Sequence, residues 1–81
     1  MNATSQDEEY LRHLTVLYVE DDEDAREQFI VFLKRITGVL LTANDGEQGL
    51  AAYHEHHPHI IITDIQMPNL DGLSMVREIR K

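Results

Sequence analysis

The chain has 81 residues, of which 42% are hydrophobic, and it carries a net charge of −8. This length suits a single domain, and the absence of cysteine excludes disulfides, thiolate chemistry and cysteine zinc sites. The excess of acid disfavours direct binding to nucleic acid or to an anionic membrane, and no apolar run approaches the roughly 20 residues that span a bilayer. Because the first residues are polar and acidic, unlike a secretory signal, we expect a cytoplasmic protein.

The chain begins with a polar stretch, residues 1–13, which we expect to be an N-terminal tail. Residues 14–19 form the first predicted strand, since its centre reads Val-Leu-Tyr-Val. Five consecutive acids, residues 20–24, follow it. Acids favour the first turn of a helix, so this run could be a solvated helix start. Its place directly after a buried strand instead favours a ligand site at the edge of a sheet.

The middle of the chain alternates between helix and strand. Residues 25–36 predict an amphipathic helix, residues 39–43 a second strand, and residues 47–57 a second helix that Pro58 ends. The apolar stripe of the first helix comprises Ala25, Phe29, Phe32, Leu33 and Ile36.

Four histidines lie close together in the sequence, at His54, His56, His57 and His59. Histidines at this density can bind zinc or nickel. Imidazolium is also favourable at the C-terminus of a helix, and no cysteine or carboxylate pattern completes a metal site. We therefore interpret them as a helix end followed by a loop.

The third strand contains three consecutive isoleucines, residues 60–62, and ends at Asp64. Such a run is typical of a strand that is buried on both faces of a parallel sheet. A lone carboxylate at the end of such a strand lies where open α/β sheets bind ligands. A loop and a third helix, from about residue 71 to the end of the chain, follow. The residues expected to shape the loop are Met67, Pro68, Asp71 and Gly72.

The element order β-α-β-α-β-α predicts an α/β fold with a doubly wound parallel sheet and right-handed crossovers. The first strand should lie in the middle, which gives the strand order 2-1-3.

Three motifs now stand in order, each at or just after the end of a predicted strand. Together they resemble the receiver domain of bacterial two-component response regulators. The resemblance covers residues 14–81 and implies a flavodoxin-like fold. The motifs are Glu20-Asp21-Asp22, Asn44-Asp45-Gly46-Glu47 and Asp64-x-x-Met67-Pro68-x-x-Asp71-Gly72.

The resemblance implies that Asp64 is a phosphoacceptor, which takes a phosphoryl group from a histidine kinase or phosphotransfer protein. Asp21, Asp22 and the backbone carbonyl of Gln66 resemble the residues that hold Mg²⁺ (or Mn²⁺) beside it. The chemistry is consistent, because a carboxylate attacks phosphorus more readily when a divalent cation neutralises the phosphoryl oxygens.

The chain departs from the family in length. A receiver has five strands, and the three strands here lack the fourth strand with its hydroxyl residue and the fifth with its lysine. We therefore expect a partial receiver domain, a truncated form that is impaired in phosphotransfer and is not an enzyme.

Two other functions compete with this interpretation. One is a phosphohydrolase with an aspartyl nucleophile, but haloacid-dehalogenase-type enzymes have a second aspartate at the position of Gln66. The other is a structural or dimerising fragment without phosphotransfer.

The missing strands also predict self-association. In a receiver the third strand is central, so here one edge of Ile60, Ile61 and Ile62 would be unpaired. Neither lysine nor proline protects this edge, which makes it a template for pairing with another chain. We expect a homo-oligomer that forms through the third strand.

Overall fold

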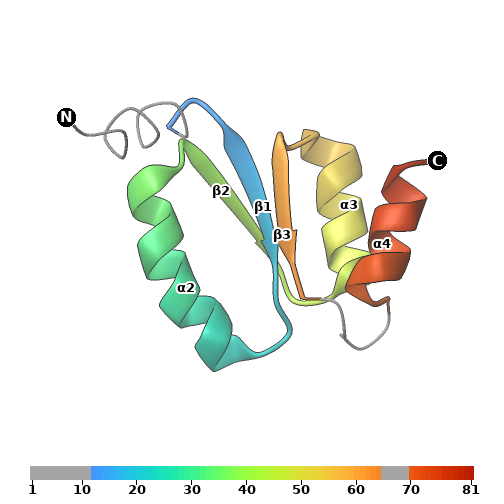
Figure 1. Ribbon diagram of the computed structural model, residues 1–81, viewed down its shortest axis with the longest axis horizontal. Helices are drawn as coiled ribbons and strands as arrows, with labels where there is room; N and C mark the ends of the chain where they lie inside the picture. The colour runs from blue at the N-terminus through green and yellow to red at the C-terminus, as the bar shows by residue number, and fades with distance from the viewer. Residues whose placement is uncertain (1–11, 65–69) are drawn as a thin grey trace.

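The computed structural model describes residues 12–64 and 70–81 (Figure 1). These residues form the predicted alternation of strands and helices, with Val39–Ala43 at its predicted bounds and the other ends within about two residues of theirs. The elements are β1 (Thr15–Val19), α2 (Glu23–Ile36), β2 (Val39–Ala43), α3 (Gly46–His56), β3 (Ile60–Thr63) and α4 (Gly72–Ile79). No helix in the described part is long and apolar enough to cross a membrane.

The three strands form one parallel sheet in the order β2-β1-β3, which confirms the predicted topology. β1 is central, with Leu17 opposite Leu41 of β2 on one side and Ile61 of β3 on the other. Because all three strands run the same way, their carboxyl ends meet at one edge of the sheet.

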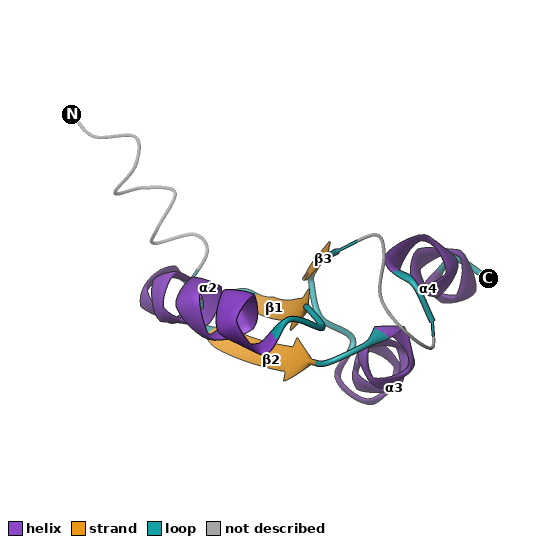
Figure 2. Ribbon diagram, turned by 90° about the horizontal axis from the view of Figure 1, so that it is seen from below, coloured by secondary structure: helices purple, strands orange, loops and turns teal. Residues whose placement is uncertain are grey.

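Helices cover the two faces of the sheet unequally. α2 lies on one face, and α3 and α4 lie together on the other (Figure 2). The main core is on the side of α3 and α4, where Leu17, Val19, Ala43 and Met75 are almost completely buried. Side chains alternate along a strand, so Tyr18 points to the opposite face, where its ring meets Phe29 of α2 at 5.1 Å.

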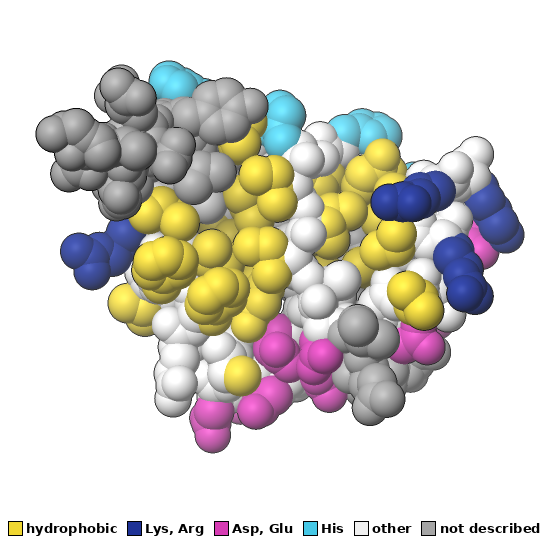
Figure 3. All heavy atoms as spheres, in the orientation of Figure 1, with side chains coloured by type: hydrophobic (Ala, Val, Ile, Leu, Met, Phe, Trp, Pro, Cys, Tyr) yellow, Lys and Arg dark blue, Asp and Glu magenta, His cyan; other side chains and the backbone are white. Residues whose placement is uncertain are grey.

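The apolar stripe predicted for α2 is only partly buried. Leu33 is buried, but Phe29 is 37% exposed and Phe32 is 53% exposed, and their rings stack at 5.8 Å. In the described part of the chain, α2 is the one helix on this face, so no second helix covers it there. The result is an exposed apolar patch over α2 and the neighbouring strands (Figure 3).

Capping residues explain the small shifts in the helix ends. Asp22 accepts a hydrogen bond from the Asp24 amide at 3.2 Å, so α2 begins two residues earlier than its apolar stripe indicates. His57 ends α3 in a left-handed conformation, with φ of 48°. The His59 ring accepts a hydrogen bond from the Thr15 amide at 2.9 Å. His54 and His56 lie in the last turn of α3 and His57 follows as its cap, so these histidines form a helix end, as we interpreted them.

Candidate functional site

Three carboxylates converge at the edge of the sheet where the strands end. Glu20 and Asp21 follow β1, Asp64 follows β3, and one oxygen of each lies within 4.8 Å of the others. A hydrogen bond from the Asp64 amide to the Val19 carbonyl, at 3.2 Å, ties the two strand ends together. Acidic side chains line this edge of the molecule (Figure 3).

Glu20 is held in place through both its backbone and its side chain. Its amide donates to the carbonyl of Ala43 at the end of β2, at 3.1 Å. Its carbonyl accepts a hydrogen bond from Nη1 of Arg26 at 2.8 Å, and its carboxylate accepts one from the Asp22 amide at 3.2 Å. The sheet and the first turn of α2 therefore fix the first carboxylate of the group.

Asp22, which the motif pairs with Asp21, is not a member of this group. Its carboxylate is engaged as the N-cap of α2. Glu20 is the first residue after β1 and thus lies level with Asp64 after β3, so it joins Asp21 and Asp64 in the group. The other predicted site residues between the strand and the last helix, Gln66, Met67 and Pro68, lie outside the described residues.

The start of α4 packs directly against Asp64. Asp71 caps this helix by accepting a hydrogen bond from the Ser74 amide at 2.7 Å, and this bond holds the pKa of the Asp71 carboxyl below its usual value. A side chain at Gly72 would overlap the carbonyl oxygen of Asp64 and approach the hydroxyl of Thr63 within 3.1 Å. Glycine therefore lets α4 begin beside the strand end.

The acids also affect the pKa of Tyr18, which lies in β1 two residues before Glu20. Its pKa is raised, mainly because the phenol is buried and next because of the negative charge of Glu20. The positive charge of Arg26 acts in the opposite direction.

This donor set suits a hard divalent cation. Mg²⁺ prefers oxygen ligands at about 2.1 Å and usually keeps several waters, so it needs only a few protein carboxylates. Asp21 and Asp64 are exposed and Glu20 is half-buried, which leaves the group accessible from solvent. Three oxygens within 4.8 Å of one another need only small shifts to share one ion.

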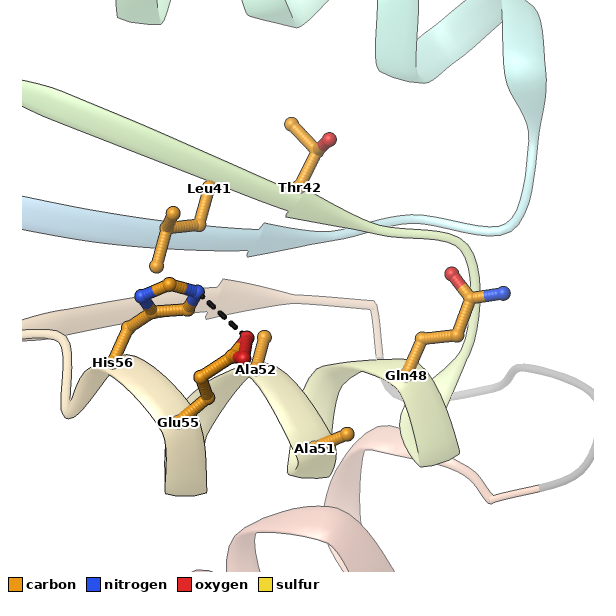
Figure 4. A pocket seen from close by; sticks show the side chains of 7 residues that line it. All are labelled: Leu41, Thr42, Gln48, Ala51, Ala52, Glu55 and His56. Atoms are coloured by element: carbon orange, nitrogen blue, oxygen red, sulfur yellow. Dashed lines mark ion pairs between the residues drawn. The ribbon is translucent and has the colours of Figure 1, made fainter.

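A hollow of about 450 Å³ between β2 and α3 is less suited to chemistry (Figure 4). Leu41, Ala51 and Ala52 form much of its wall. Two of its polar side chains, Glu55 and His56, are occupied with each other, because Nε2 of His56 lies 3.0 Å from a carboxylate oxygen of Glu55.

Comparison with known proteins decides the family. A family model for the response regulator receiver domain matches residues 16–81. The chain belongs to this family. Receiver domains are signalling domains that bind Mg²⁺ and interact with histidine kinases or phosphotransfer proteins, and the three parallel strands match their flavodoxin-like fold.

Curated relatives and solved structures agree with this assignment. The chain is 41% identical over 66 residues to a probable transcriptional regulator, ycf27, of Guillardia theta, covering 82% of this chain and 26% of that protein. It resembles the N-terminal domain of an uncharacterized protein from Wolinella succinogenes with 43% identity and a TM-score of 0.80, over 83% of this chain and 54% of that one.

A third comparison concerns a structure that contains a metal. The receiver domain of the histidine kinase CKI1 from Arabidopsis thaliana, complexed with Mg²⁺ and BeF₃⁻, is 29% identical with a TM-score of 0.71, over 93% of this chain and 60% of that one. The chain thus spans about a quarter of the curated relative and just over half of these solved chains.

Proposed function

We propose that this chain is a phosphoacceptor module in which Asp64 takes a phosphoryl group from a histidine kinase or phosphotransfer protein. The observation that carries the proposal is the convergence of Asp64 with Glu20 and Asp21 at the carboxyl edge of a parallel sheet. The family match and the neighbour complexed with Mg²⁺ and BeF₃⁻ support it.

In the proposed reaction, an oxygen of Asp64 forms a bond to phosphorus while the bond from phosphorus to the donor's nitrogen breaks. Bound Mg²⁺, or Mn²⁺, would neutralise charge on the phosphoryl oxygens. Glu20 and Asp21 would hold the ion, and Asp22 and the Gln66 carbonyl are further ligands that the family motif suggests. The exposure of Asp64 lets a donor approach its carboxylate.

We propose further that these 81 residues accept phosphoryl groups slowly on their own. A fixed positive charge against the phosphoryl group stabilises the transition state. The sequence has two lysines. Lys34 is in the last turn of α2, away from the acids that precede its first turn, and Lys81 bonds to Glu78 at 2.9 Å. Arg26 is nearer to the acids, but its guanidinium donates to the carbonyl of Glu20.

A titration with Mn²⁺ tests the metal site and separates the two possible acid pairs. We expect Asp21→Asn to weaken binding at least about tenfold, since even hydrogen-bond partners of metal ligands are worth that much. We expect Asp22→Asn to weaken binding less, because asparagine still caps α2. A larger loss in Asp22→Asn would show that Asp21 and Asp22 hold the ion, and unchanged binding in both would remove the site from this edge.

We also propose that the chain self-associates through the outer edge of β3. β3 pairs with β1 on one side, and no described strand pairs with its other side. Ile62 lies opposite Tyr18, so it faces the side of α2 and extends the apolar patch of Phe29 and Phe32. A second β3, antiparallel across a two-fold axis, would pair the open edge and continue the sheet to six strands.

Light scattering at micromolar concentration tests this proposal. The register between β1 and β3 shows which isoleucine of β3 to replace. Ile61 lies opposite Leu17 and packs in the core, so a lysine there would unfold the chain. Ile62→Lys should give monomers, because it places a charge on the paired edge. Thr42→Lys, at the outer edge of β2, is the matched control and should leave the assembly intact. If the unchanged chain is a stable monomer, the proposal of self-association is wrong.

A further inference from the structure

Arg26 joins the first turn of α2 to the loop that carries two of the three acids. Its backbone amide donates to the carbonyl of Asp22 at 2.9 Å, within the first turn of the helix. Its guanidinium reaches further back and donates to the carbonyl of Glu20 at 2.8 Å. The two bonds tie the segment of residues 20–26 together, between the end of β1 and the first turn of α2.

The hydrogen bond to Glu20 has a useful chemical property. It uses a carbonyl oxygen, so it fixes the backbone between Glu20 and Asp21 without occupying a carboxylate oxygen there. The bond is half-buried and charge-assisted, which makes it stronger than an ordinary hydrogen bond. The Glu20 amide is fixed in turn by Ala43, so both sides of this residue are anchored.

The charge of Arg26 also lies close to the backbone of Glu20, the residue that carries the first of the three carboxylates. The other cations of α2, Lys34 and Arg35, are in its last turn and far from the acids. The charge of Arg26 also acts to lower the pKa of Tyr18, in the strand that Glu20 follows.

We propose that Arg26 is a positioning residue of this site, holding the Glu20–Asp21 turn so that both carboxylates face Asp64 and share a divalent cation with it. This role rests on the proposed function, because it assumes that the acids bind a cation.

The direction in which Arg26→Gln changes the affinity for a cation separates a positioning role from a simple effect of charge. Arg26→Gln removes a positive charge near the site, and charge alone predicts tighter binding of a cation. Loss of positioning predicts the opposite, because the Glu20–Asp21 turn is released. The direction of the change therefore decides between the two.

The experiment is a titration of the 81-residue chain with Mn²⁺, followed by electron paramagnetic resonance, with circular dichroism to check folding. We expect Arg26→Gln to weaken Mn²⁺ binding about tenfold. Arg26→Lys, which keeps the charge but loses the forked donor, should be weakened less. Arg35→Gln is the matched control, with the same loss of charge at the far end of α2, and should bind as the unchanged chain does.

Equal or tighter binding by a folded Arg26→Gln chain would overturn the proposal. If that variant unfolds, Arg26→Lys decides, and an affinity equal to that of the unchanged chain would overturn the role. Binding that is lost in Asp64→Asn but insensitive to Arg26 would overturn only the positioning role. Absence of Mn²⁺ binding by the unchanged chain would overturn the metal site and the role of Arg26 together.

Discussion

Asp64→Asn should gain no mass when it is incubated with an acyl-phosphate donor and Mg²⁺, whereas the unchanged chain should gain one phosphoryl group in a minor fraction of molecules. The carboxylate is the nucleophile in the proposed reaction, and a neutral amide cannot replace it. Intact-mass spectrometry measures the labelled fraction directly. The exposure of Asp64 makes unfolding an improbable cause of the loss, and circular dichroism checks this.

Asp24→Asn is the matched control for this experiment. It makes the same change of charge in the first turn of α2, outside the group of three carboxylates, and should be labelled like the unchanged chain. Labelling that persists in Asp64→Asn would place the phosphoacceptor elsewhere. Rapid, stoichiometric labelling of the unchanged chain would contradict the proposal that these residues work slowly alone.

The labelling experiment also bears on the competing functions, a structural or dimerising role and a phosphohydrolase. A folded chain that never gains mass would support a structural or dimerising role. An assay of phosphate release covers the other alternative: continuous release from a phosphomonoester would support a phosphohydrolase. Such an enzyme would be expected to have an aspartate where this chain has Gln66.

The fold could be predicted because every element carries its own local signal. Val39–Ala43 lies between Gly38 and Asn44, and its bounds match the prediction. The helix ends were harder to place, because a cap depends on one hydrogen bond that the apolar spacing does not contain. Asp22 and Asp45 both cap helices in this way, through Asp24 and Gln48.

The site could be predicted only in part. Asp21 and Asp64 were expected at this edge, and the geometry brings them together. Glu20 was not expected in this group, because five adjacent acids look alike in sequence. Which of them approach Asp64 depends on where β1 and β3 end. Glu20 could have been predicted by taking the first residue after each neighbouring strand, which gives Glu20 after β1 and Asp64 after β3. The link from Arg26 to the Glu20 carbonyl had no signal, since a long side chain can reach back along the helix in several directions.

Gly72→Ala should damage both the stability of the chain and its metal site. A methyl group at this position would overlap the carbonyl oxygen of Asp64 and lie 3.0 Å from its carbonyl carbon. These are backbone atoms of the strand end, so they cannot yield as a flexible side chain would. The φ angle of Gly72 is negative, so the cost comes from lack of space and not from backbone conformation.

We expect Gly72→Ala to lose about 1–3 kcal/mol in the free energy of unfolding, as over-packed sites do. We also expect weaker binding of Mn²⁺, because relief of the overlap must move Asp64 or the start of α4. Urea denaturation and the Mn²⁺ titration measure the two effects on the same samples.

Gly49→Ala is the matched control, because it adds the same methyl group in a core contact away from the acids. There the new atom meets Sδ of Met75 at 2.6 Å and Cγ2 of Val19 at 2.9 Å. Both are side-chain atoms, and the methionine, which makes the closer contact, can adjust. Gly49→Ala also gains helix propensity of about 1 kcal/mol, so its net loss of stability should be smaller. Its Mn²⁺ affinity should be unchanged, because Asp64 is not touched. If Gly72→Ala matched Gly49→Ala in both measurements, α4 would not begin against the carbonyl of Asp64, and the start of this helix would not position the phosphoacceptor.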